Sequence, residues 1–500
     1  MQIVKPLAAA LLAGLLGRHL FQRLRRRGPI GLPVLGSLPY MLYRAFVEPG
    51  FRWYRFLNEM RAAYGDVISV VLGTQEFILI SGYQQIKAAL VGRADQFSQR
   101  PNQPLYQVMA QGRGLLLSEG ALWLEHRRFT LRVLRDFGLG RSLSEQQIQT
   151  EAQELAAKLS DLSGQETDLN VHITKAIVNV IGSLVFAQRS GYEDPKLDNF
   201  LHHTKALTQA GLDTELMFFF PQLPAWLTAL APSTGRYLQS EKWIMDHCRE
   251  KIQAIDRNYD ESSEPSCFVE AYLQEQRLRQ ASGGVGSFDN LQLVRTVLDL
   301  YLAGSETTAT TLRWALLYCS FHPEYQEACH AEIAASIGLR EVSMKDKRGL
   351  HKVQAFLDET QRIANLVPMS VEHRVSEAVE LDGLPISPDS LVLPNLYSVH
   401  MDPELFPEPH EFKPDRFIDP ETGTYKASEY LIPFSLGKRA CLGETLARME
   451  LFIFFVTLLQ KFRFEPTEDC RLRRDEILLG PDGVVRAPGD HSLVVHKRRL

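Results

Sequence analysis

One cysteine stands out because of its neighbours. Residues 434–444 read FSLGKRACLGE, and an apolar helical pattern follows over residues 445–459. Cys441 therefore lies at the start of a predicted helix, where free backbone N–H groups and the helix dipole stabilise a thiolate and lower its pKa. A thiolate is also a ligand for transition metals. Gly437 and Gly443 would let the backbone turn tightly and approach a flat ligand closely.

Two further residues of this loop suit such a ligand. Phe434 is placed to pack against the sulfur or a ring, and Arg439 to neutralise a carboxylate. The alternative is a buried structural cysteine in a Gly-rich turn. Five specified positions coincide here, which happens by chance on the order of 10⁻⁴ times per chain, so the pattern favours the ligand. The remaining cysteines form no C-x-x-C pair and fit inert, reduced thiols: Cys248, Cys267, Cys319, Cys329 and Cys470.

An acid followed by an alcohol occurs inside a long helical pattern. Residues 303–308 read AGSETT, with Glu306 and Thr307 adjacent. A glycine such as Gly304 costs about 1 kcal/mol in a helix interior, so it needs a reason. A local opening of the hydrogen-bond ladder would make room for a small ligand, and Glu306 and Thr307 would then relay protons to it. The alternative is a Thr-rich buried helix with a close-packing glycine.

Two pairs of residues have helical spacing. Trp123 and Arg127 are four apart, so both side chains point the same way. Glu359 and Arg362 are three apart and share one face. Alone, the second pair is typical of a solvated surface ion pair.

Together these motifs resemble the cytochrome P-450 superfamily, whose loop has the form F-x-x-G-x-R-x-C-x-G and whose oxygen-binding segment reads A-G-x-D/E-T-T. The style of residues 300–308 and 361–368 is that of the microsomal family 2 type. The resemblance spans nearly the whole chain. It implies a cytochrome P-450 fold and a heme b cofactor (iron protoporphyrin IX), with Cys441 as the proximal iron ligand.

The resemblance also implies roles for other residues. Thr307 would lie beside bound oxygen and Glu306 would supply protons. The heme propionates would be bound by Trp123, Arg127, Arg100 and His373, with Arg439 also contacting the cofactor. Glu359, Arg362 and Arg416 (in the segment Pro414-Asp-Arg-Phe) would form a structural triad beneath the heme loop.

The activity implied is that of a monooxygenase. It would insert one atom of O₂ into an apolar small molecule (a fatty acid, a steroid or a xenobiotic), using electrons from NADPH through a flavoprotein reductase. Arg128, Arg132 and Arg135 share a helix face that would dock this reductase; a plain solvated basic face is the alternative. The rivals are a heme-thiolate isomerase or dehydratase of lipid peroxides, which needs no proton relay, and a non-catalytic heme binder.

The elements that must position these residues are mostly helical. Helices are expected within residues 144–187, as two segments, and over 287–320, 324–337 and 352–365. Short strands are expected at Val67–Leu72, Phe77–Ile80, Ala378–Leu381 and Leu391–Leu393. The Ser- and Gly-rich stretch 262–286 is expected to be a long surface loop. The fold class is therefore mainly α with a small β region, as a single large catalytic domain.

Composition agrees with a globular enzyme. The chain has 500 residues, of which 45% are apolar and 23% charged, which excludes a disordered or fibrous protein. The formal net charge of −5 argues against nucleic acid as a partner.

The first residues predict a membrane segment. An uncharged run, LAAALLAGLLG, precedes a cluster of arginines, and no acid occurs before Glu48. We expect 1–27 to be a membrane anchor with a basic stop, 28–50 a Pro/Gly hinge and 51–500 the catalytic domain. The expected location is the endoplasmic reticulum membrane with the catalytic domain cytoplasmic. A mitochondrial presequence, and hence the mitochondrial inner membrane, is the alternative; a cleaved secretory signal or a soluble protein fits less well.

Overall fold

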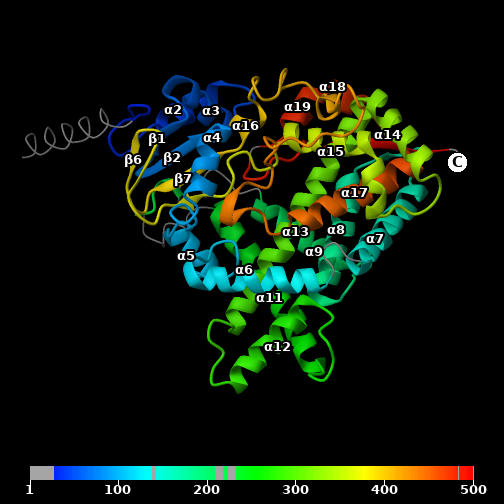
Figure 1. Cartoon of the computed structure of the whole chain (residues 1–500), viewed down its shortest axis with the longest axis horizontal. Helices are drawn as coiled ribbons and strands as arrows, with labels where there is room; N and C mark the ends of the chain where they lie inside the picture. Colours follow the sequence, from blue (N-terminus) through cyan, green and yellow to red (C-terminus); the bar gives the residue numbers. More distant parts are fainter. Residues whose placement is uncertain (1–26, 138–141, 209–217, 223–231, 482, 499–500) are drawn as a thin grey trace, which may run out of the picture.

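The computed structural model describes residues 27–137, 142–208, 218–222, 232–481 and 483–498. A small sheet region lies near the N-terminal end, and helices form the rest of the body (Figure 1). Helices α11 and α12 extend below the main body in this view. The fold class predicted from the sequence is confirmed: the protein is mainly α with a small β region.

The helices up to the long central one are α2 (Leu38–Val47), α3 (Trp53–Tyr64), α4 (Tyr83–Lys87), α5 (Pro104–Ala110), α6 (Gly120–Asp136), α7 (Ser142–Asp161), α8 (Leu169–Phe186), α9 (Pro195–Thr208), α11 (Pro232–Asn258), α12 (Phe268–Ala281) and α13 (Asn290–Phe321). Those that follow are α14 (Pro323–Ser336), α15 (His351–Ala364), α16 (Tyr397–His400), α17 (Glu444–Lys461), α18 (Glu468–Leu472) and α19 (Arg474–Leu479).

The strands form small sheets. The first has the order β1-β2-β7-β4, in which β2 and β7 are parallel and the other pairs antiparallel. The second has the order β3-β9-β8, and β5 pairs with β6. Their bounds are β1 (Val67–Leu72), β2 (Gln75–Ser81), β3 (Glu166–Thr167), β4 (His373–Arg374), β5 (Val379–Leu381), β6 (Leu384–Ile386), β7 (Leu391–Asn395), β8 (Phe462–Pro466) and β9 (Leu493–Lys497).

The main core surrounds α13. This helix begins at the N-cap Asp289, whose side chain accepts the N–H of Gln292 at 2.8 Å, and it ends where Pro323 starts α14. Helices α8 and α17 pack against it, and all three are apolar over most of their circumference because they are buried on several sides. The helices expected at 144–187, 287–320, 324–337 and 352–365 are confirmed within a few residues.

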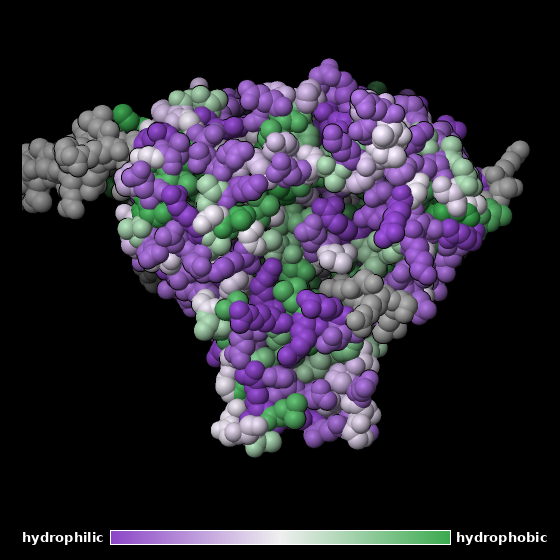
Figure 2. All heavy atoms as spheres, in the orientation of Figure 1, coloured by the Kyte–Doolittle hydropathy of each residue, from purple (hydrophilic) through white to green (hydrophobic). Residues whose placement is uncertain are grey.

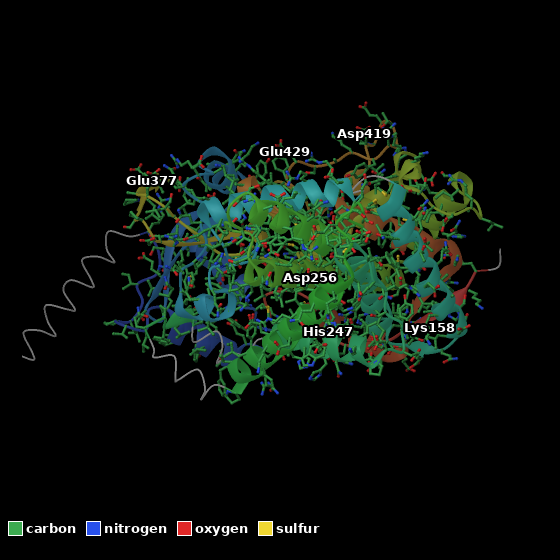
Figure 3. All side chains as sticks on the ribbon, turned by 90° about the horizontal axis from the view of Figure 1, so that it is seen from below. Lys158, His247, Asp256, Glu377, Asp419 and Glu429 are labelled. Atoms are coloured by element: carbon green, nitrogen blue, oxygen red, sulfur yellow. The ribbon has the colours of Figure 1, made fainter. Side chains whose placement is uncertain are left out.

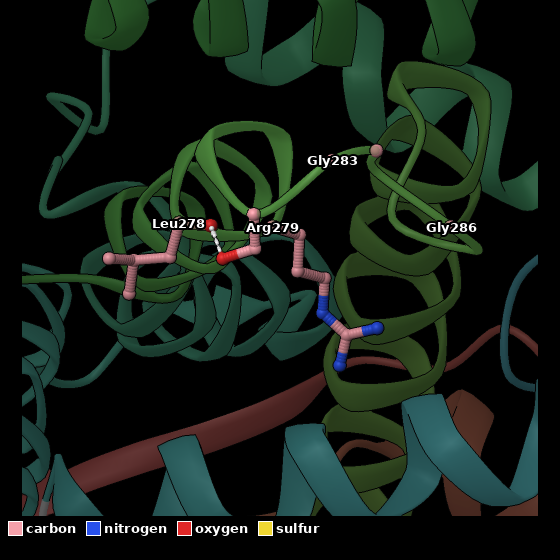
Figure 4. A pocket seen from close by; sticks show the side chains of 6 residues that line it. Leu278, Arg279, Gly283 and Gly286 are labelled. Atoms are coloured by element: carbon pink, nitrogen blue, oxygen red, sulfur yellow. Dashed lines mark hydrogen bonds between the residues drawn. The ribbon is translucent and has the colours of Figure 1, made fainter.

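The loop expected over residues 262–286 is wrong for its middle part. Residues Phe268–Ala281 form α12, because its first two turns place apolar side chains on one buried face. Phe129 of α6 packs edge-on against Tyr272 of this face. Residues 262–267 before this helix and the Gly-rich turn after it form loops, as expected. Figure 4 shows this turn beside α12, where Arg279 contributes to a surface hollow of about 500 Å³.

The segment 28–50 is docked rather than extended. The N–H of Ser37 donates to Val71 O, and Ser69 N donates to Arg27 O, so the chain before α2 is held along β1. Helix α2 then occupies residues 38–47, with Phe46 91% exposed. The expected anchor at residues 1–27 lies outside the described residues, except for Arg27.

Within the described ranges, α8 is long and apolar enough to cross a membrane. It is mostly buried inside the protein, which is the state of a core helix. Polar side chains cover most of the face in Figure 2, with apolar groups in its middle. From below, α11 presents Asp256 and His247, and α7 presents Lys158 (Figure 3).

Candidate functional site

Arginine, tryptophan and histidine side chains surround the loop that carries Cys441. Trp123 and Arg127 of helix α6 lie on the same side of the helix, as their spacing predicts, and both contact residues of this loop. The guanidinium of Arg439 lies 3.8 Å from the centre of the Trp123 ring, and that of Arg127 lies 5.7 Å from it. Arg127 also donates to the carbonyl oxygen of Ala440 at 2.7 Å. Helix α6 and the cysteine loop are thereby joined side by side.

Arg100 and His373 complete this group. Arg100 donates to Leu116 O at 3.0 Å and to Glu372 O at 2.6 Å. His373 lies on β4, and its Nδ1 contacts Phe97 O at 2.5 Å. Burial, with the nearby charges of Arg100 and Arg439, lowers the pKa of His373 to about 3. The imidazole is therefore neutral at pH 7, with Nδ1–H as the donor to Phe97 and Nε2 remaining for a further contact.

The three guanidinium groups lack carboxylate partners. Among the described residues, none of Arg100, Arg127 and Arg439 forms an ion pair, and their hydrogen bonds go to backbone carbonyls. Burial, together with the charges of Arg100 and Arg127, lowers the pKa of Arg439 to about 8. Burial, together with the charge of Arg127, lowers the pKa of Arg100 to about 10, although the Glu372 carboxylate opposes that change. Buried cations that repel one another are stabilised by an anionic ligand. This arrangement fits a flat group carrying carboxylates.

Cys441 lies at the centre of the loop. Its N–H donates to Phe434 O at 2.9 Å, and it is exposed, whereas the other five cysteines are buried. The surrounding protein raises the pKa of its thiol by desolvation, and the N–H groups of Gly443 and Glu444 oppose that rise. The prediction of a lowered pKa is therefore wrong in net direction, because desolvation by the protein atoms around the thiol outweighs the helix-start donors. A coordinated metal ion deprotonates such a thiol outright.

Gly437 and Phe434, two other residues of the cysteine loop, have contacts within the protein itself. Gly437 has a φ of +76°, and a Cβ there would collide with the carbonyl oxygen of Leu90. The turn predicted at Gly437 is thus confirmed, but the backbone it approaches closely is that of the π-helix at Ala88–Gly92. The Phe434 ring lies 4.9 Å from the guanidinium of Arg448 and is half-buried.

The acid–alcohol pair lies on α13. Thr307 donates its hydroxyl proton to Ala303 O at 2.7 Å, and Glu306 accepts from the Thr310 hydroxyl at 3.4 Å. Burial raises the pKa of Glu306, which favours a carboxyl that can carry a proton. No hydrogen bond or ring contact among the described residues joins either side chain to the Cys441 loop, although α13 packs against α17.

Gly304 is explained by close packing and not by an opened hydrogen-bond ladder. The helix is continuous through this position, so the opened ladder is not present. A Cβ at residue 304 would lie 2.7 Å from Cδ1 of Ile181 on α8. Gly304 therefore permits close packing of α13 on α8.

The triad of Glu359, Arg362 and Arg416 is formed. Glu359 Oε2 lies 2.7 Å from Arg362 Nε and 3.1 Å from Arg416 Nε. Glu359 and Arg362 are fully buried. Arg362 also donates to the carbonyl oxygens of His400 and Pro409, both at 2.8 Å. This network connects α15 to the segment that precedes the cysteine loop.

Two acids were missed by sequence reasoning, the half-buried Asp299 and the buried Glu450. Asp299 Oδ2 accepts the N–H groups of Leu115 at 2.6 Å and Leu116 at 2.9 Å, which holds that loop against α13. Burial raises the pKa of Asp299 to about 6. Glu450 lies inside α17, where burial raises its pKa to about 8 and the Thr308 hydroxyl is its partner. A lone acid within an apolar helical run is the signal that marks both.

Comparison with known proteins establishes the class. The family model described as cytochrome P450 matches residues 27–493, so the chain belongs to the cytochrome P450 family. Human cytochrome P450 2J2 is 36% identical over 473 residues, which covers 93% of this chain and 90% of that protein. Cytochrome P450 2U1 of Bos taurus is 32% identical over 98% of this chain and 93% of the relative. Cytochrome P450 2K1 of Oncorhynchus mykiss is 35% identical, covering 94% and 91%.

The protein is accordingly an oxidoreductase of the monooxygenase type, with heme as the family cofactor and O₂ and a small molecule as substrates. The cluster of unpaired cations around the Cys441 loop fits that cofactor. The expected resemblance to cytochrome P450 proteins of family 2 is confirmed by these relatives.

Proposed function

We propose that this protein inserts one oxygen atom from O₂ into an apolar organic substrate, such as a fatty acid, steroid or xenobiotic, with electrons that come from NADPH through a flavoprotein reductase. The observation that carries the proposal is the combination of a solvent-exposed thiol with buried guanidinium groups that lack carboxylate partners. When bound, heme would supply the activation of dioxygen.

Each residue of the cluster then has a task. Cys441 would bind the iron as a thiolate. Arg100, Arg127, Arg439, Trp123 and His373 would bind the propionates, and Phe434 would pack against the sulfur or the ring. The contacts that support this assignment are the stacking of Arg439 on Trp123 and the hydrogen bond from Arg127 to Ala440.

Glu306 and Thr307 would deliver protons to oxygen. Thr307 has a hydroxyl at a half-buried position of α13, and burial raises the pKa of Glu306, which favours the protonated form of its carboxyl. A heme-thiolate isomerase or dehydratase needs no such pair, and a non-catalytic heme binder needs no proton supply. Dependence of product formation on NADPH separates the monooxygenase from both.

Replacing Thr307 by alanine tests the relay. We expect Thr307→Ala to consume NADPH while releasing hydrogen peroxide, with product formation per NADPH reduced about 100-fold, at the lower end of what a proton-transfer group contributes. Peroxide, product and NADPH are measured together. Thr311→Ala is the matched control, because its hydroxyl lies one turn further on and donates to Thr307 O. Full coupling in Thr307→Ala would contradict the role.

Reductase docking is proposed for the exposed face of α6 formed by Arg128, Arg132 and Arg135. Arg132→Glu/Arg135→Glu should raise the apparent KM for reductase about tenfold at low salt, less at high salt, because electrostatic steering is lost. The carbon-monoxide spectrum should stay unchanged. Lys242→Glu on α11 is the control for a charge reversal elsewhere. An unaltered reductase titration would sink this docking surface.

For location, we propose the endoplasmic reticulum membrane with the catalytic domain in the cytoplasm; the mitochondrial inner membrane is the second candidate. The proposed division is a membrane anchor at 1–27, a hinge at 28–50 and a catalytic domain at 51–500. The apolar run at residues 7–17 supports the anchor. Exposed Tyr43 and Phe46 on α2 would suit contact with a lipid surface close to that anchor.

A further inference from the structure

Further polar side chains follow Glu306 along α13, toward the C-terminal end of this helix. Glu306, Thr310 and Arg313 follow one another at helical spacing, so they share one face of the helix. The Thr310 hydroxyl donates to Glu306 Oε1 at 3.4 Å. This face runs from the acid proposed to deliver protons to a buried arginine two turns away.

Arg313 is unusual in its surroundings. It is 8% exposed, yet among the described residues it forms no direct ion pair and donates no hydrogen bond to a protein atom. A buried guanidinium without a partner is costly, and ordered water is the ordinary means of satisfying such a group. The charges that act on it come from three carboxylates, Glu306, Asp168 and Asp490.

These carboxylates belong to elements that meet beside α13. Thr167 pairs with Leu493 between β3 and β9, which places Asp168, the N-cap of α8, close to residues 490–492. Trp314 donates its ring N–H to Arg486 O at 3.1 Å, which holds the same C-terminal segment against α13. Asp168 and Asp490 are exposed, so this end of the group reaches solvent.

His491, on the same C-terminal segment, is close enough to Arg313 to feel its charge. Its Nδ1 contacts Gly489 O at 2.7 Å, and it is half-buried. The charged groups facing it are Arg313, Asp168 and Asp490. With Nδ1–H donating to the carbonyl, Nε2 remains available to exchange protons with water.

Glu306 is influenced by cations from two elements. Arg313 on α13 and Lys205 on α9 both favour its ionised form, while burial favours the protonated form. Loss of the Arg313 charge therefore has a defined effect on Glu306, separate from any effect on the shape of the site.

We propose that Thr310, Arg313 and His491, with the surface carboxylates Asp168 and Asp490, form a hydrated route that resupplies Glu306 with protons from solvent. The inference rests on the proposed role of Glu306. Each proton that Glu306 gives up is replaced by a proton from water held by Arg313. That water in turn regains a proton from bulk solvent, through His491 or through the two carboxylates. Arg313 keeps its own proton and acts as a positioning residue, since a guanidinium does not deprotonate readily.

The test uses the heme-loaded protein and the carboxyl stretch of Glu306 in infrared spectra, assigned by its loss in Glu306→Gln. In Arg313→Gln the pKa of Glu306 should rise by about one unit, the shift expected from losing a cation two helical turns away. The solvent isotope effect on turnover should increase. Arg313→Lys keeps the charge, so the pKa of Glu306 in that variant should stay close to its wild-type value.

A second variant avoids the buried position. His491→Gln/Asp490→Asn should enlarge the solvent isotope effect and lower product formed per NADPH, with an unchanged melting temperature. His330→Gln is the matched control, because His330 is also half-buried and contacts a backbone carbonyl, that of Leu459. An unchanged Glu306 band in Arg313→Gln, or an unchanged isotope effect in the double variant, would overturn the route. Full coupling in Glu306→Gln would instead overturn the role of Glu306 itself.

Discussion

Cys441→Ala should lose the Soret band that marks thiolate ligation in the carbon-monoxide spectrum of the reduced protein, and monooxygenase activity should fall at least about 100-fold. The physical reason is that the thiolate donates electron density to the iron and so favours cleavage of the O–O bond. The loop geometry is expected to survive, because the Cys441 N–H bond to Phe434 O does not involve the side chain.

The control is a cysteine remote from the loop. Cys267 is buried immediately before α12, and Cys267→Ala should keep the thiolate-type band. Spectra, heme content and product formation are measured on all three proteins. A normal band in Cys441→Ala would show that another residue holds the iron.

Glu359→Ala should be the most destabilising single change outside the loop. Glu359 is fully buried and pairs with Arg362 and Arg416, so its removal leaves an uncompensated buried charge. Breaking a buried pair in this way costs about 3–5 kcal/mol of unfolding free energy. Denaturant unfolding and heme content measure the effect, and both should fall together because α15 is tied to the segment before the cysteine loop.

An exposed pair provides the comparison. Glu476 pairs with Arg473 at the surface of α19, and Glu476→Ala should change stability little because solvent screens the interaction. If Glu359→Ala were as stable as this variant, the triad would have no structural role.

Local patterns were sufficient for much of the fold. The β-branched run at Val67–Leu72, apolar except for Ser69, predicted β1 correctly, and the long periodic segment with a proline after it predicted α13. Residues 268–281 were misjudged because flanking Ser and Gly residues obscured a buried face of only two turns. Propensity describes neighbours along the chain, whereas this face is explained by packing against α6.

The site shows the same division. The spacing of Trp123 and Arg127 predicted that both side chains point the same way, and the structure adds that they point to the cysteine loop. The partner of Gly437 could not be predicted, since Leu90 is about 350 residues earlier in the chain. The pKa of Cys441 was misjudged for a similar reason: helix-start donors are visible in sequence, but desolvation depends on what surrounds the sulfur in three dimensions.

The group of residues proposed to bind the heme propionates has a consequence for biosynthesis. Its members come from residues 100, 123–127, 373 and 439–441, so the complete group cannot form until the last of these segments has been synthesised. Until then a nascent chain holds Arg100 and Arg127 without their later neighbours. Domains generally fold as units during synthesis, and a ligand that binds only the folded state stabilises it by mass action. Cofactor capture should therefore be a late, nearly post-translational event that completes the fold and depends on how much heme is available.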